Sequence, residues 1–150
     1  MKAEQSSLYR HLETLHLWSV ETFENAPKNP VVQADIRLLV ENVVQAQSAV
    51  AMALMTENLS QRVDFLDVVV MSMTNIKSIT KVLTEYVPST VRKKSVSENE
   101  SIIVRGSHVI SKKGRVRLLD IMTQIGSELG RWRNKTLSQI RTEKAATLPN

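Results

Sequence analysis

The sequence predicts an all-α fold, an antiparallel up-down-up-down four-helix bundle with a long basic linker before the fourth helix. Two observations lead to this prediction. Apolar residues recur every three or four positions over most of the chain, which is the spacing of one helix face. The 150 residues contain only four glycines and four prolines, so long unbroken helices are favoured over many short strands. With 42% hydrophobic residues the chain can bury one core, and residues 1–150 are expected to form a single domain.

The first helix is predicted over residues 7–24, where leucine and tryptophan side chains recur at helical spacing. Ser6 or Ser7 is expected to cap it, because a serine hydroxyl accepts a free backbone N–H at the start of a helix. The segment 25–30 contains two prolines and two asparagines, so the helix is expected to end there.

The second and third helices are predicted over residues 30–57 and 60–86. Asn29 precedes the second helix as its cap, with a proline in the first turn, and Ser60 is the expected cap of the third. Apolar residues cover more than one face of the second helix, so several neighbours or a second copy of the protein are expected to bury it. The short connections between these helices predict antiparallel neighbours.

A long polar connection is predicted at residues 87–111, which lack helical periodicity. Within it, the apolar run 102–104 is expected to form a short extended piece. The fourth helix is predicted over residues 112–144, beginning near Ser111.

Positive charge is concentrated in the C-terminal part of the chain. Residues 1–87 contain seven Lys and Arg against ten Asp and Glu, a net charge of −3. Residues 88–117 contain eight against two, and residues 118–150 contain five against three, so the last 63 residues carry +8. This asymmetry indicates a polyanionic partner, nucleic acid first and an anionic membrane surface second.

Composition excludes several kinds of chemistry. The chain has no cysteine, which rules out disulfides, thiolate metal sites and cysteine nucleophiles. No secretory signal is apparent, because polar residues follow Met1 directly. The longest purely apolar run, residues 49–55, is much shorter than the roughly 20 residues of a membrane span. We therefore expect a soluble cytoplasmic protein that does not insert into a membrane.

Two glycines stand beside the apolar seam of the fourth helix. Gly126 and Gly130 lie one turn apart, and each costs about 1 kcal/mol relative to alanine inside a helix. We therefore expect another helix backbone to pack closely against them, and we expect Trp132 to close the core at the end of the seam. The seam residues have a 4-3-4-3 spacing and are Leu118, Met122, Ile125, Leu129 and Trp132.

Nucleic acid is the expected ligand of the basic residues, because phosphate binding draws its affinity from several positive groups and the counterions they release. Only 4% of the residues are aromatic, so sequence-independent phosphate contacts are favoured over base stacking. The alternative is that these side chains form only a solvated surface and a charged linker. The predicted nucleic-acid-binding residues are Arg92, Lys93, Lys94, Arg105, Lys112, Lys113, Arg115, Arg117, Arg131, Arg133 and Lys135.

No catalytic residues, cofactor or metal site is predicted. His11 and His16 are five positions apart, unlike the i, i+4 histidine pair of a helical zinc site. Arg10 and His16 fit an R-x5-H pattern that resembles the ribonuclease motif of HEPN helical proteins, which leaves an RNA-cleaving enzyme as one alternative. A purely structural adaptor, acting only through protein contacts, is the other.

The end of the chain resembles a known family. Residues 125–132 match the pattern IG-x-x-LG-x-W on which its members commonly finish, and the turn 23–30 and the short polar link within 56–70 also fit. This is the family of small four helix bundle proteins. It includes the products of intervening sequences in large-subunit ribosomal RNA genes and the accessory variability determinant of diversity-generating retroelements. The resemblance covers roughly residues 8–136.

The resemblance implies a protein without catalytic residues that presents a basic surface and assembles as a homopentamer. It also implies binding to RNA or DNA and to the reverse transcriptase of a diversity-generating retroelement. We therefore expect a nucleic-acid-binding accessory protein that self-associates and assists complementary-DNA synthesis.

Overall fold

The computed structural model describes residues 6–85, 92–93, 102–103 and 109–147, and these contain four helices packed against one another. The helices are α1 (Ser7–Glu24), α2 (Pro30–Met55), α3 (Leu59–Glu85) and α4 (Lys112–Thr147). Two strands of two residues each, β1 (Arg92–Lys93) and β2 (Ile102–Ile103), pair in antiparallel fashion. The predicted all-α fold with four helices is confirmed.

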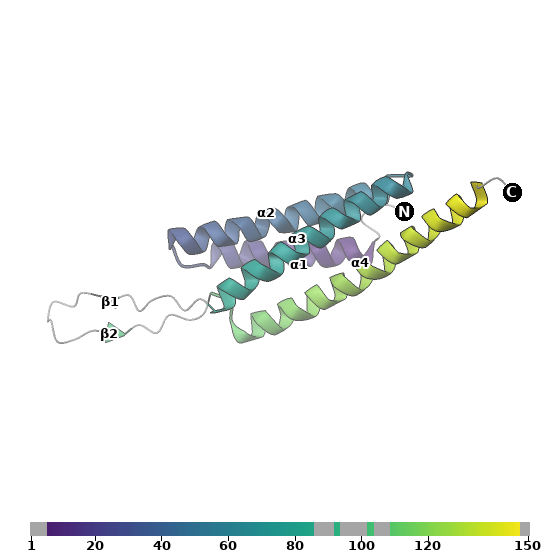
Figure 1. Ribbon diagram of the computed structural model, residues 1–150. Coiled ribbons are helices and arrows are strands. Elements are labelled where there is room, and N and C mark those ends of the chain that lie inside the picture. Colours follow the sequence, from purple (N-terminus) through teal and green to yellow (C-terminus); the bar gives the residue numbers. More distant parts are fainter. Residues whose placement is uncertain (1–5, 86–91, 94–101, 104–108, 148–150) are drawn as a thin grey trace.

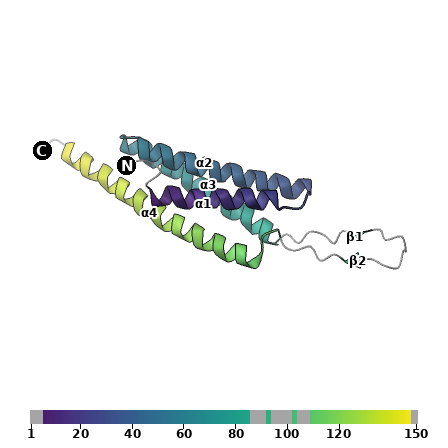
Figure 2. The same ribbon diagram turned by 180° about the vertical axis from the view of Figure 1, so that it is seen from behind.

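Each helix packs against two others. α2 contacts α1 and α3, and α4 contacts α3 and α1. Figure 1 shows that α4 crosses its neighbours obliquely, and both views show that its C-terminal part extends beyond them (Figures 1 and 2). The paired strands lie at the opposite end of the molecule. The long, oblique course of α4 leaves much of its surface uncovered by the other three helices.

The core follows the apolar stripes that helical spacing predicts. A side-chain pair joins the middle of α2 to α3 beside the core: Asn75 donates from Nδ2 to Oδ1 of Asn42 at 3.1 Å, and Asn42 donates to the Leu38 carbonyl at 2.8 Å. Slippage of one helix along the other would leave the side-chain oxygen of the buried Asn42 without its donor, so this pair favours one register. The largest fully buried side chains include Leu12, Leu15, Ile36, Leu39, Leu66, Ile76, Leu83 and Ile125.

Helices α1 and α2 begin at residues that the sequence predicts as caps. The hydroxyl of Ser6 accepts the Tyr9 N–H at 3.4 Å, and the side chain of Asn29 accepts the Val31 N–H at 2.9 Å. Pro30 occupies the first position of α2, where its missing N–H carries no cost.

The connection between α2 and α3 differs from the prediction. α2 ends at Met55 rather than at residue 57, because Thr56 adopts an extended backbone with φ −81° and ψ 136°. The prediction of Ser60 as the cap of α3 is wrong. Asn58 has this role, since its side-chain oxygen accepts the Gln61 N–H at 3.0 Å, and α3 begins one residue earlier than predicted.

Most of the predicted linker, residues 87–111, lies outside the described residues. Of the predicted extended piece, Ile102 and Ile103 form β2, whereas Val104 lies outside the described residues. The predicted start of the fourth helix is confirmed, and Ser111 caps it by accepting the Gly114 N–H at 3.1 Å. The helix ends at residue 147, three residues beyond the prediction.

Helix α2 keeps apolar side chains on its outer surface as well as on its buried face. Val31, Leu38, Met52 and Met55 are between 48% and 75% exposed. Within the described residues, α2 alone is long and apolar enough to cross a bilayer by length and composition, and 39% of that stretch is buried inside the molecule. The expectation drawn from uninterrupted apolar runs did not single out this helix. Packing against α1 and α3 accounts for its buried face only, and the outer face has no neighbour among the described residues.

Candidate nucleic-acid interface

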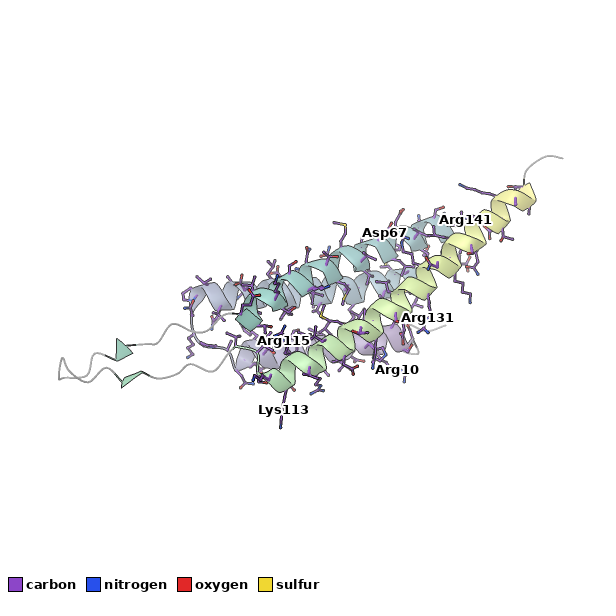
Figure 3. The ribbon with its side chains drawn as sticks, turned by 60° about the horizontal axis from the view of Figure 1, so that its bottom comes forward. Arg10, Asp67, Lys113, Arg115, Arg131 and Arg141 are labelled. Atoms are coloured by element: carbon purple, nitrogen blue, oxygen red, sulfur yellow. The ribbon has the colours of Figure 1, made fainter. Side chains whose placement is uncertain are left out.

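Four of the predicted nucleic-acid-binding residues lie together at the start of α4. Lys112, Lys113, Arg115 and Arg117 occupy its first two turns, and all four side chains are exposed. Figure 3 shows Lys113 projecting away from the body of the molecule, whereas Arg115 lines a groove between α3 and α4. The cap at Ser111 fixes the backbone from which these side chains extend. We call these four residues the α4 cation cluster.

Two residues of the α4 cation cluster, Lys112 and Lys113, stand in the first turn, where a helix disfavours positive charge. The free N–H groups of a helix start carry a partial positive charge, and a cation there costs typically 0.3–1 kcal/mol. The first turn of α4 contains no acidic residue, and within the described part of the chain the four cations form no ion pair. A bound anion removes this repulsion and accepts hydrogen bonds from the same groups.

Arg131 and Lys135 form a second exposed basic group further along the same helix. Lys113 and Arg131 are 18 residues apart, which is five full helical turns, so both leave the same face of α4 about 27 Å apart. Arg117 and Lys135 repeat this relationship. Asp120 lies on the same face between the two groups. The helix therefore aligns two pairs of cations along one side.

Arg133 belongs to neither group. Its Nε donates a hydrogen bond to a carboxylate oxygen of Asp67 on α3 at 2.8 Å, and both side chains are partly exposed. The carboxylate offsets the guanidinium charge, so the structure assigns Arg133 to holding α4 against α3 rather than to a free basic surface. Sequence spacing alone did not reveal this partner, because the two residues are 66 positions apart.

The linker residues of the predicted interface are largely untested. Arg92 and Lys93 form β1, opposite Ile103 and Ile102. Lys94 and Arg105 lie outside the described residues. The predicted set is therefore brought together in part, at the start and in the middle of α4.

The prediction of close helix packing at Gly126 and Gly130 is wrong within this chain. A Cβ atom built at either position would meet nothing within 4 Å. α4 packs on α1 and α3 through Leu118, Ile121, Ile125 and Leu129, and both glycines stay exposed. They line an open groove of about 750 Å³ between α3 and α4. Trp132 behaves as predicted on one side, since it packs against the core, but it remains half-buried.

The residues of the alternative ribonuclease motif lie on α1. Arg10 is exposed and His16 is half-buried. Six residues rotate a side chain by about 240° around the helix axis beyond one full turn, so Arg10 and His16 leave different faces of α1. His11 lies nearer to an acidic group, with Nε2 at 3.4 Å from Oε1 of Glu128. Within the described residues, no three His, Asp or Glu side chains gather in a way that could hold a metal ion.

Comparisons of the chain with protein-family models, with curated proteins and with solved structures find no match. The family resemblance at residues 125–132 therefore stays a prediction.

Proposed function

We propose that this protein is a non-catalytic nucleic-acid-binding protein that holds phosphates along α4. The observation that carries the proposal is the α4 cation cluster, whose four positive charges lack carboxylate partners among the described residues. Two of them, Lys112 and Lys113, stand in the first turn, at the positive end of the helix. A polyanion satisfies this surface, because several phosphates can be contacted at once and their counterions released.

A polymer is a better ligand for α4 than a small anion. Along one face of α4, about 27 Å separates the pair of Lys113 and Arg117 from the pair of Arg131 and Lys135, because 18 helical residues rise by that length. A single phosphate reaches one pair only. A nucleic-acid strand carries regularly spaced phosphates and can reach both cation pairs. Such phosphate contacts do not depend on the identity of the bases.

We also propose that the four helices of each chain form an antiparallel up-down-up-down bundle, and that this bundle self-associates. The exposed face of α2 supports this, because Val31, Leu38 and Met52 recur at intervals of seven or fourteen residues, the spacing of a helix–helix seam. The groove between α3 and α4 is the proposed acceptor of this seam from a second copy. Exposed glycines at Gly126 and Gly130 permit a backbone to approach closely there.

Charge supports the same pairing. The charged residues that line the groove are Lys77, Lys81, Glu85, Arg115 and Arg133, the last paired with Asp67, so cations outnumber the one carboxylate. The exposed face of α2 carries Glu41 between its apolar residues. A carboxylate entering a basic groove gains favourable contacts, and two basic grooves facing each other would not. The homopentamer and the reverse-transcriptase partner rest on the family resemblance, and they complete the proposed role as an accessory factor of a diversity-generating retroelement.

The experiment that tests nucleic-acid binding reverses the α4 cation cluster to glutamate at Lys112, Lys113, Arg115 and Arg117. Acidic residues in the first turns of a helix favour its dipole, so the variant is expected to fold. Binding to RNA and to DNA should fall at least tenfold. A matched pair of double variants controls for net charge. One reverses Lys113 and Arg117, and the other reverses Arg141 and Lys144 near the end of the same helix. The second variant should bind nucleic acid more strongly than the first.

The reverse-charge variant also separates the proposal from its competitors. Unchanged retention of RNA and DNA by a folded variant would overturn nucleic-acid binding through α4 and leave an adaptor as the better account. Cleavage of labelled RNA that disappears on His16→Ala would instead favour the ribonuclease. Sedimentation showing a strict monomer at micromolar concentration would remove self-association.

A further inference from the structure

A second pocket, of about 520 Å³, lies where the start of α1, the end of α2 and the middle of α4 come together. Its apolar lining comes from Leu8, Leu54 and Trp132. Three cationic side chains surround this lining, one from α3 and two from α4: Arg62, Arg131 and Lys135. An aromatic ring in an apolar recess with cations around it is suited to a flat ring that carries a negative group.

The cations from α4 lack carboxylate partners among the described residues. Arg131 and Lys135 are four residues apart on one helix face, where like charges repel each other. One acidic residue, Glu128, also lines the pocket: it accepts a hydrogen bond at 2.9 Å from the hydroxyl of Ser7, another lining residue, and lies 3.4 Å from His11. Its carboxylate is thereby held toward α1. The pocket lining still holds three cations against this one carboxylate, so an excess of positive charge remains for a ligand.

Arg62 is held in place by the backbone rather than by an acid. Its Nε donates to the Ala53 carbonyl at 3.1 Å and one Nη to the Thr56 carbonyl at 2.8 Å, both at the end of α2. These carbonyls fix the guanidinium without neutralising it. A positive group is therefore preorganised at the rim, and less conformational freedom is lost when an anion binds.

Trp132 supplies the surface on which a ring can stack. Part of its indole packs against the core and part lines the pocket, in agreement with its half-buried state. Nucleobases stack on such rings regardless of base identity. Only bases that are not paired in a duplex can gain this stacking energy, because paired bases are already stacked on their neighbours. The neighbouring Arg131 and Lys135 lie on the same face of α4 as the first cation pair, along the proposed path of the phosphates.

We infer that this pocket takes up one unpaired nucleotide of a single strand, with its base on Trp132 and its phosphate between Arg131 and Lys135. The inference rests on the proposed nucleic-acid binding and extends it, because it gives a preference for single-stranded over double-stranded ligands. The low aromatic content of the sequence argued against stacking in general. One indole placed beside unpaired cations is sufficient for stacking at a single position.

Fluorescence titration with an oligothymidylate tests this directly. The other tryptophan, Trp18, is only 9% exposed but lies beside Gly114 at the start of α4, so the emission change of the Trp132→Phe variant is subtracted to isolate the signal of Trp132. The single strand should quench the emission, and a hairpin duplex with the same number of phosphates should not. The variant Trp132→Leu should lose about tenfold in affinity for the single strand and nothing for the duplex.

A second variant keeps the test independent of packing. Trp132→Phe retains an aromatic ring and should recover most of the single-strand affinity, whereas Trp132→Leu should not, with circular dichroism showing equal helix content for both. Equal affinity of wild type and Trp132→Leu for the single strand would overturn the pocket. If charge reversal of the α4 cation cluster still lowers the affinity for both ligands in that case, the proposed function stands. If it lowers neither affinity, the proposed function fails as well.

Discussion

Arg133 donates a hydrogen bond from Nε to a carboxylate oxygen of Asp67 at 2.8 Å and so ties α4 to α3. Arg131, two residues earlier on the same helix, forms no ion pair within the described part of the chain. Two arginines that look equivalent in the sequence therefore differ in whether a carboxylate offsets their positive charge. The charge of Arg133 is offset by Asp67, whereas that of Arg131 is available to an external anion.

This difference gives a matched pair of variants. Arg131→Gln and Arg133→Gln each remove one positive charge from the same helix. Arg131→Gln should weaken nucleic-acid binding several-fold, because a free phosphate contact is lost. Arg133→Gln should have little effect on binding and should lower the free energy of unfolding by about 0.2–1 kcal/mol, the usual range for an exposed pair. Affinity at one fixed salt concentration and urea unfolding measure the two effects; equal losses of affinity would contradict the assignment.

The salt dependence of binding should report the number of phosphates held by the α4 cation cluster. Replacing Lys112, Lys113, Arg115 and Arg117 by glutamine should reduce the slope of log affinity against log salt concentration by about 0.9 for each duplex phosphate contact that is lost. The measurement is a set of binding titrations at several salt concentrations. A slope that stays the same in the folded variant would show that these residues do not contact phosphates.

The exposed glycines of α4 predict opposite effects on the single chain and on its assembly. Gly126→Ala with Gly130→Ala should stabilise the monomer by up to about 1 kcal/mol at each site, because alanine favours the helix and its Cβ has free space. The same methyl groups should weaken self-association by keeping a partner backbone away. Urea unfolding and sedimentation velocity measure these two quantities.

Ser127→Ala is the control for this experiment, since the residue lies between the glycines on α4 but does not line the groove. It should leave the assembly unchanged. Association that survives the double alanine variant at full strength would show that the groove is not the contact surface.

The cap of α3 offers a local test of the fold. Asn58→Ala should lower the free energy of unfolding by about 1 kcal/mol, because the Gln61 N–H loses its acceptor. Ser60→Ala should change it by much less, since no hydrogen bond of the Ser60 side chain contributes to this cap. Thermal or urea unfolding of the two variants decides between the residues, and a larger loss for Ser60→Ala would reverse the assignment.

Local patterns predicted the helices well because their causes are local. The spacing of apolar residues, the caps at Ser6 and Asn29, and the proline after Asn29 all act within one or two turns. The error at Asn58 is of the same kind, since two polar residues close together can both cap a helix and only the path of the backbone decides between them.

The candidate site was less predictable because it depends on contacts between distant segments. The four cations at the start of α4 are close in sequence and could be predicted as a group. The pairing of Arg133 with Asp67 and the engagement of Glu128 by Ser7 join different helices. The glycines beside the apolar seam indicated a close contact, but no sequence pattern could tell whether the neighbour belongs to the same chain.

The outer face of α2 and the groove beside Gly126 belong to different helices, so every copy carries both halves of the proposed contact. A copy whose groove is filled by a bulky side chain keeps an intact α2. Mixed with normal copies, it should bind the groove of a normal copy through its own α2, whereas its filled groove could accept no further copy. A small proportion of such copies would terminate assembly, so the variant would inhibit the assembly of normal chains in a mixture.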